Sequence, residues 1–151
     1  MKKVYFFSES YKNEFLKDLS GLEGKVELIK SLNLPAEEVL ARGFDYILLQ
    51  EGEFENFKNL IGAISWKASQ LGVADALMRV EGGYKPVNLN ADCILQILRS
   101  RNFKLDTSQS AMIIGSYDFV LSVAVKIALS GYSNILVSLF EKERVVELEK
   151  K

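Results

Sequence analysis

The sequence predicts an α/β fold. Short apolar runs, which are typical of buried strands, alternate along the chain with segments whose apolar residues recur at helical spacing. Turn residues, mainly glycine with polar neighbours, separate the two kinds of segment. This alternation of strands and helices favours parallel sheets. A length of 151 residues predicts one domain, or a small domain with part of a second.

The first half of the chain is expected to begin with a strand and to alternate from there. Pro35, placed at the first position of a helix with acidic residues in the first turn, marks one helix start, and Gly43 closes that helix. The expected strands are 4–7, 25–28 and 44–49, and the expected helices are 11–19, 36–40 and 54–64, with a continuation at 68–73.

The second half is expected to open with a hairpin, because Ala76–Val80 and 84–88 flank Glu81, Gly82 and Gly83. A polar segment at 100–109 predicts a linker between two domains, 1–100 and 110–151. The remaining expected helices are 91–99, 117–130 and 141–150, and the expected strands are 111–114 and 134–139.

Composition excludes several classes of function. The net charge of −1 and the lack of a basic cluster argue against nucleic acid as a partner. No apolar stretch approaches the length of a membrane span, so a cytoplasmic protein is expected. With no histidine and one cysteine, a disulfide within the chain and a His/Cys zinc site are excluded, and no metal site is expected. Cys93 is expected to be a small core residue.

Residues 110–137 have the pattern strand, tight turn, helix, turn, strand, which is typical of the opening of a dinucleotide-binding fold. The fingerprint of that fold needs three glycines, for the turn, for backbone approach to the pyrophosphate and for helix packing. Only Gly115 is present, and Tyr117 and Val120 take the other two places. The candidate cofactor-binding residues are Gly115, Ser116, Tyr117 and Asp118. The tyrosine ring and the added negative charge of Asp118 both disfavour a pyrophosphate.

Three short strings, in matching order, resemble the shikimate dehydrogenase family. The run 43–45 (Gly-Phe-Asp) before an apolar strand resembles the family's Gly-Phe-Asp-Gly strand. The run 71–76 resembles its Ile-Gly-Ala-Val-Asn-Thr segment, and 88–92 resembles its Gly-Tyr-Asn-Thr-Asp segment. Residues 111–137 then fall where the family's cofactor domain begins. The resemblance implies a shikimate-dehydrogenase-like α/β domain followed by a partial Rossmann (βαβα) unit, and thus a truncated, degenerate relative.

The family reduces 3-dehydroshikimate to shikimate with NADPH, and it uses a lysine–aspartate pair near the substrate hydroxyl. The position of the lysine falls on Phe54, whereas the aspartate is kept as Asp92. By the same resemblance, the residues that would hold the substrate are Ser8, Ser10, Asp75 and Asn90. Asp75 stands where the family has a neutral asparagine, and it would repel a carboxylate substrate.

Two interpretations of Asp92 remain open, because an aspartate at a helix start either caps the helix or works as an acid or base. Phe54 can neither move a proton nor stabilise charge on a substrate oxygen. After the second strand of the cofactor unit, Glu141 stands where NADP enzymes of the family usually carry a basic residue. These changes together predict loss of the ancestral reaction, with NADP not bound.

Three functions therefore compete. The first is a non-catalytic shikimate dehydrogenase-like protein with a binding or assembly role. The second is a working NADP-dependent oxidoreductase of that type, acting on 3-dehydroshikimate or a related small-molecule acid. The third is an unrelated α/β regulatory binding domain. The family's cofactor domain has about six strands, so either this chain is a fragment or a partner completes its sheet. We favour a homodimer, or a partner chain, that forms one continuous sheet.

Overall fold

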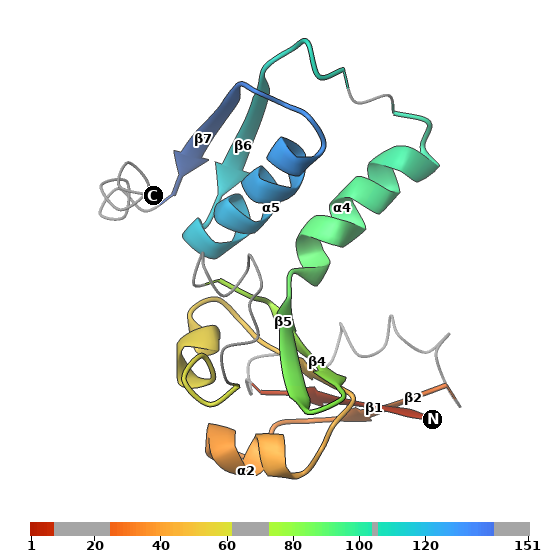
Figure 1. The fold of residues 1–151 in the computed structure, drawn as a ribbon, viewed down its shortest axis with the longest axis vertical. Helices are drawn as coiled ribbons and strands as arrows, with labels where there is room; N and C mark the ends of the chain where they lie inside the picture. Colours follow the sequence, from red (N-terminus) through yellow and green to blue (C-terminus); the bar gives the residue numbers. More distant parts are fainter. Residues whose placement is uncertain (8–24, 62–72, 104–105, 141–151) are drawn as a thin grey trace. The chain divides into compact units, whose positions relative to one another are not determined.

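The computed structural model describes residues 1–7, 25–61, 73–103 and 106–140. The chain divides into two compact units, Met1–Val87 and Asn88–Lys151 (Figure 1). Both units combine strands with helices, so the predicted α/β class is confirmed. The expected helices at 11–19 and 141–150 and the continuation at 68–73 fall wholly or mainly outside the described residues.

The first unit is built on a five-stranded sheet with the strand order β2-β1-β3-β4-β5. β1 pairs in parallel with both β2 and β3, as the alternation predicts. β4 and β5 add an antiparallel hairpin, so the sheet is mixed. The positive φ angles of Gly82 (85°) and Gly83 (149°) form the predicted turn. The strands are β1 (Lys2–Phe6), β2 (Val26–Ile29), β3 (Tyr46–Leu48), β4 (Ala76–Val80) and β5 (Gly83–Val87).

One core cluster of this unit lies on one face of the sheet, while Phe6 and Ala76 are buried on the other face. Strand register places Tyr5, Ile47 and Leu77 side by side across β1, β3 and β4, and all three are fully buried. The short helix α2 (Ala36–Ala41) contributes Val39 to the same cluster. The Phe44 ring stacks on Tyr5 with a centroid distance of 4.7 Å, so the segment after α2 is fixed to the sheet.

The predicted helix at 54–64 is wrong over the residues that the structure describes. The chain forms a 3-10 helix, η2 (Glu53–Asn56), and then turns through Ile61. Phe54 and Phe57 are buried in the core, and Ile61 packs against it. A 3-10 turn brings residues three apart to the same side, so the apolar spacing that predicts an α-helix is satisfied by successive tight turns.

The second unit consists of α4 (Leu89–Ser100), β6 (Ala111–Gly115), α5 (Tyr117–Leu129) and β7 (Ile135–Leu139). β6 and β7 are parallel and α5 connects them, as the sequence predicts. The helix packs on one face of this strand pair through a cluster that includes Ile113, Val120, Val123 and Ile135.

Helix α4 differs from the prediction in two respects. The predicted domain limits, 1–100 and 110–151, assign it to the first domain, whereas in the structure it belongs to the second unit and contacts α5. Cys93 is exposed, so its assignment to the core is wrong. Ala91 and Leu95, four residues apart, form the buried face of α4, and residue 93 lies on the opposite side of the helix.

Among the described residues, no helix combines the length and hydropathy needed to cross a membrane.

Candidate functional site

The turn from β6 to α5 holds the candidate cofactor residues. Ser116 is the N-cap of α5 in an extended conformation, and its carbonyl accepts the N–H of Val120 at 2.9 Å. Its side chain makes no capping hydrogen bond. Gly115 is buried, and a Cβ at this position would stand 2.7 Å from Cδ1 of Phe119. The retained glycine therefore lets the α5 side chains pack closely on the end of β6.

The two positions that lack the fingerprint glycines are filled. Tyr117 is 5% exposed, and Val120 is fully buried against Ala91 and Ile113. Asp118 lies in the first turn of α5, where its negative charge complements the helix dipole. The helix start thus already contains an anionic group, and side chains occupy the space that glycines leave open in a dinucleotide site.

Asp92 is not the N-cap of α4, so the capping role considered from the sequence is wrong. It lies in the first turn of α4, whose N-cap is Asn88, and its carboxylate forms an ion pair with Lys126 of α5 (Nζ–Oδ1 2.6 Å). The Asp92 side chain is 53% exposed, and that of Lys126 is 21% exposed. The pair links the two helices of the second unit. Sequence reasoning missed Lys126, because only the packing of α4 on α5 brings the two charges together.

A groove with a volume of about 460 Å³ runs beside this ion pair. Arg99 and Lys126, both in last turns of their helices, contribute positive charge to it. Cations near a helix C-terminus interact favourably with the helix dipole. The positions of Arg99 and Lys126 therefore have a structural explanation. The groove is lined by Asp92, Leu95, Gln96, Arg99, Lys126, Leu129 and Ser130.

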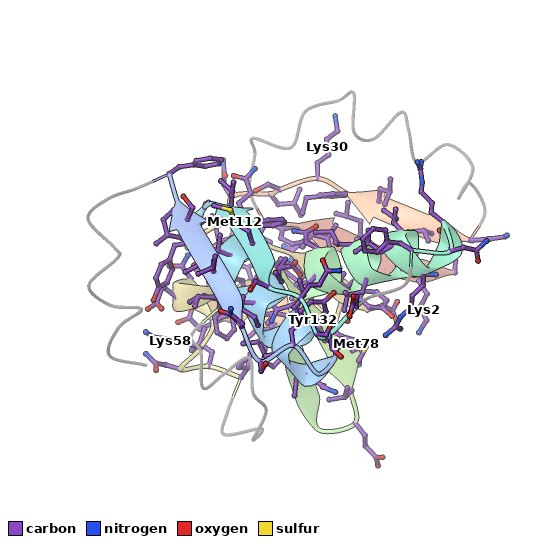
Figure 2. All side chains as sticks on the ribbon, turned by 90° about the horizontal axis from the view of Figure 1, so that it is seen from above. Lys2, Lys30, Lys58, Met78, Met112 and Tyr132 are labelled. Carbon is purple, nitrogen blue, oxygen red and sulfur yellow. The ribbon has the colours of Figure 1, made fainter. Side chains whose placement is uncertain are left out.

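Phe54, to which the sequence resemblance assigns the position of the family's catalytic lysine, is 1% exposed and belongs to the core of the first unit. The nearest lysine along the chain is Lys58, labelled in Figure 2, and it forms an ion pair with Glu55. A buried aromatic ring at position 54 offers no group that transfers a proton. The lysine–aspartate pair of the family therefore has no counterpart at this position.

The remaining predicted substrate residues are spread over the chain. Asp75 is half-buried just before β4, and its backbone N–H donates to the carbonyl of Val87 at 3.2 Å. Asn90 is exposed in the first turn of α4. Ser8 and Ser10 lie outside the described residues. The structure thus groups Gly115–Asp118 at one helix start but does not show the substrate residues as one site.

The Gly43-Phe44-Asp45 string has structural roles. Gly43 has a φ of 68°, and its carbonyl accepts a hydrogen bond from Nη1 of Arg79 at 2.8 Å. Asp45 accepts the backbone N–H of Lys3 at 2.8 Å and pairs with Nζ of Lys2 at 3.0 Å. The Lys3 N–H, followed by the Lys2 ammonium, lowers the pKa of the Asp45 carboxyl. These contacts stabilise the first unit.

Within the described ranges, no three potential metal ligands among aspartate, glutamate and cysteine come together. The comparison with protein families found no matching family model. No curated protein matches the sequence either.

Solved structures, in contrast, match nearly the whole chain. Shikimate 5-dehydrogenase from Thermus thermophilus, in complex with shikimate, matches 99% of it with a TM-score of 0.68 and 17% identity. The enzyme from Listeria monocytogenes, in complex with shikimate and NAD, matches 99% with a TM-score of 0.73 and 10% identity. Quinate dehydrogenase from Corynebacterium glutamicum, in complex with NAD, matches 98% with a TM-score of 0.69 and 13% identity.

The chain spans 61%, 54% and 57% of the lengths of these three proteins, respectively. At such low sequence identities, the similarity shows a shared fold. It does not show that the site carries out the same chemistry. This chain has the fold of the shikimate dehydrogenases.

Proposed function

We propose that this chain is a shikimate dehydrogenase-like protein that does not carry out the dehydrogenase reaction and acts through binding or assembly. The observation that carries the proposal is the burial of Phe54. Its ring is buried in the core at the position where the resemblance expects the catalytic lysine. Hydride transfer to a ketone needs a group that donates a proton to the developing alkoxide. Phe54 supplies none.

The ion pair of Asp92 supports the same proposal. In the family this carboxylate works together with the catalytic lysine, whereas here it is held by Lys126 of the neighbouring helix. An exposed pair of this kind contributes at most about 1 kcal/mol to stability. Its consequence for chemistry is larger, because the carboxylate already has a cationic partner that is not part of the expected site.

The β6–α5 turn does not fit a dinucleotide. The pyrophosphate of such a cofactor binds exposed backbone N–H groups at a helix start that carries no anion. In this chain Tyr117 and Val120 stand where glycines are needed, and Asp118 contributes a negative charge beside them. The buried Tyr117 and Val120 instead make this turn part of the core of the second unit.

A turnover assay tests the proposal. The purified chain is incubated with shikimate and NADP⁺, and NADPH formation is followed by its absorbance, with a solved family enzyme as the positive control. The expected result is no rate above the blank. Turnover that falls by about 10²–10⁴-fold in Asp92→Asn, but not in Glu37→Gln, would establish the oxidoreductase alternative. Glu37 is a suitable control because it is an exposed acid in the first turn of α2.

A further inference from the structure

The strand pair β6–β7 has one covered and one uncovered face. The register pairs Met112 with Leu136 and Ile114 with Ser138, so these side chains share a face. The other face, with Ile113 and Ile135, contacts α5. Phe140 continues the alternation of β7 on the uncovered face, and its N–H donates to the carbonyl of Gly115 at 3.1 Å. We call Met112, Ile114, Leu136 and Phe140 the bare face; Met112 is labelled in Figure 2.

The four side chains of the bare face are large, apolar and exposed. Their exposed fractions are 65% for Met112, 54% for Ile114, 54% for Leu136 and 75% for Phe140. With about 200 Å² for a fully exposed side chain of this size, the bare face presents on the order of 500 Å² of apolar surface. An apolar patch of this size equals the largest patch on a typical monomer, and such patches are often functional.

The sequence of the two strands is also typical of strands that are buried on both faces. β6 reads Ala-Met-Ile-Ile-Gly and β7 reads Ile-Leu-Val-Ser-Leu. Continuous apolar runs of this kind are typical of strands buried on both sides, whereas a strand with one solvated face alternates apolar with polar residues. Among the described residues, each of the two strands pairs only with the other. Neither carries the lysine or proline that commonly protects an exposed edge.

We propose that the bare face packs against the bare face of a second copy of this chain. The absence of charge from both strands favours this occupant, because a two-fold axis brings each residue near its own copy and so penalises charged patches. Two bare faces together bury on the order of 1,000 Å², at the lower end for specific association. The dimer is therefore expected to be weak, with a Kd in the micromolar range.

The bare face would be the contact surface for the assembly role proposed above. The inference rests on the proposed function to that extent. Contact between faces also differs from pairing of strand edges, because it depends on the outward side chains rather than on free backbone groups. The turnover assay tests the loss of catalysis and the experiment below tests the interface, so failure of one is distinguishable from failure of the other.

Sedimentation equilibrium of the full chain, over a range of concentrations, measures the dimer. Ile114→Lys is expected to raise the Kd by at least about 100-fold, because it places a charge in an apolar contact. Ile97→Lys is the matched control, since Ile97 on α4 is 55% exposed and lies outside the bare face. This control should leave the Kd unchanged.

Circular dichroism checks that each variant folds. If Ile114→Lys does not fold, Ile114→Thr serves in its place, because threonine keeps the strand propensity while it removes apolar surface. A wild-type chain that stays monomeric at millimolar concentration would overturn the proposal. So would a dimer that Ile114→Lys and Ile97→Lys weaken equally, or one that neither substitution affects.

Discussion

At the scale of single residues, Gly115 has a packing role that does not depend on a cofactor. In a dinucleotide site this glycine allows a tight turn before the phosphates. Here the space above its Cα is occupied by the ring of Phe119, which a Cβ would approach to 2.7 Å. The glycine is thus required by the packing of α5 on β6, whether or not a cofactor binds.

Gly115→Ala is accordingly expected to destabilise the chain by about 1–3 kcal/mol, the usual cost of overpacking in a core. Urea unfolding followed by circular dichroism measures the change. The matched test is the double variant Gly115→Ala/Phe119→Leu, in which the smaller side chain makes room and recovers part of the loss. If Gly115→Ala proves as stable as the wild type, the packing role assigned to this glycine is wrong.

At the scale of elements, the first unit depends on a carboxylate that joins β1 to the start of β3. Asp45 accepts the N–H of Lys3 and pairs with Lys2, and both contacts lower its pKa below the ordinary value of 3.8. A carboxyl whose pKa is lower in the folded state stabilises the fold above its unfolded pKa. That stability is lost as the pH falls through the folded pKa.

At neutral pH, Asp45→Asn is therefore expected to be less stable than the wild type. When the pH falls below about 4, the variant should lose less stability than the wild type does, because it has no carboxyl at position 45 to protonate. Urea unfolding at a series of pH values measures both effects. The Asp45 carboxyl lies at the surface, so the difference should shrink in high salt. Glu37→Gln serves as the control, and an identical acid profile for the wild type and Asp45→Asn would contradict this account.

The elements also show what sequence patterns can and cannot predict. The β4–β5 hairpin was predictable because two adjacent glycines supply the positive φ angles of its turn. The segment after Gly52 was mistaken for an α-helix, since the spacing of Phe54, Phe57 and Ile61 suits both a helix and successive tight turns. Only the shape of the core decides between the two. Cys93 was misplaced because the buried face of α4 is set by Ala91 and Leu95.

At the scale of the whole molecule, short strings in the right order predicted the fold, whereas the contacts of the site needed the structure. The strings at 43–45 and 88–92 resemble the shikimate dehydrogenases, and the solved structures share that fold. The Asp92–Lys126 ion pair joins two helices whose relative placement no local pattern specifies. Likewise, the fully buried Val120 could be recognised as a lost glycine, but its packing partners could not.

The most direct test of the account is titration of the purified chain with NADPH and with NADP⁺ by calorimetry, with a solved family enzyme as the control. The account predicts no heat of binding at millimolar cofactor, because Tyr117, Asp118 and Val120 replace the open helix start that a pyrophosphate needs. Saturable binding in the micromolar range, abolished when Ser116 and Tyr117 are replaced but retained in Glu37→Gln, would contradict it. The β6–α5 turn would then be a working cofactor site, and the protein would have to be considered an enzyme.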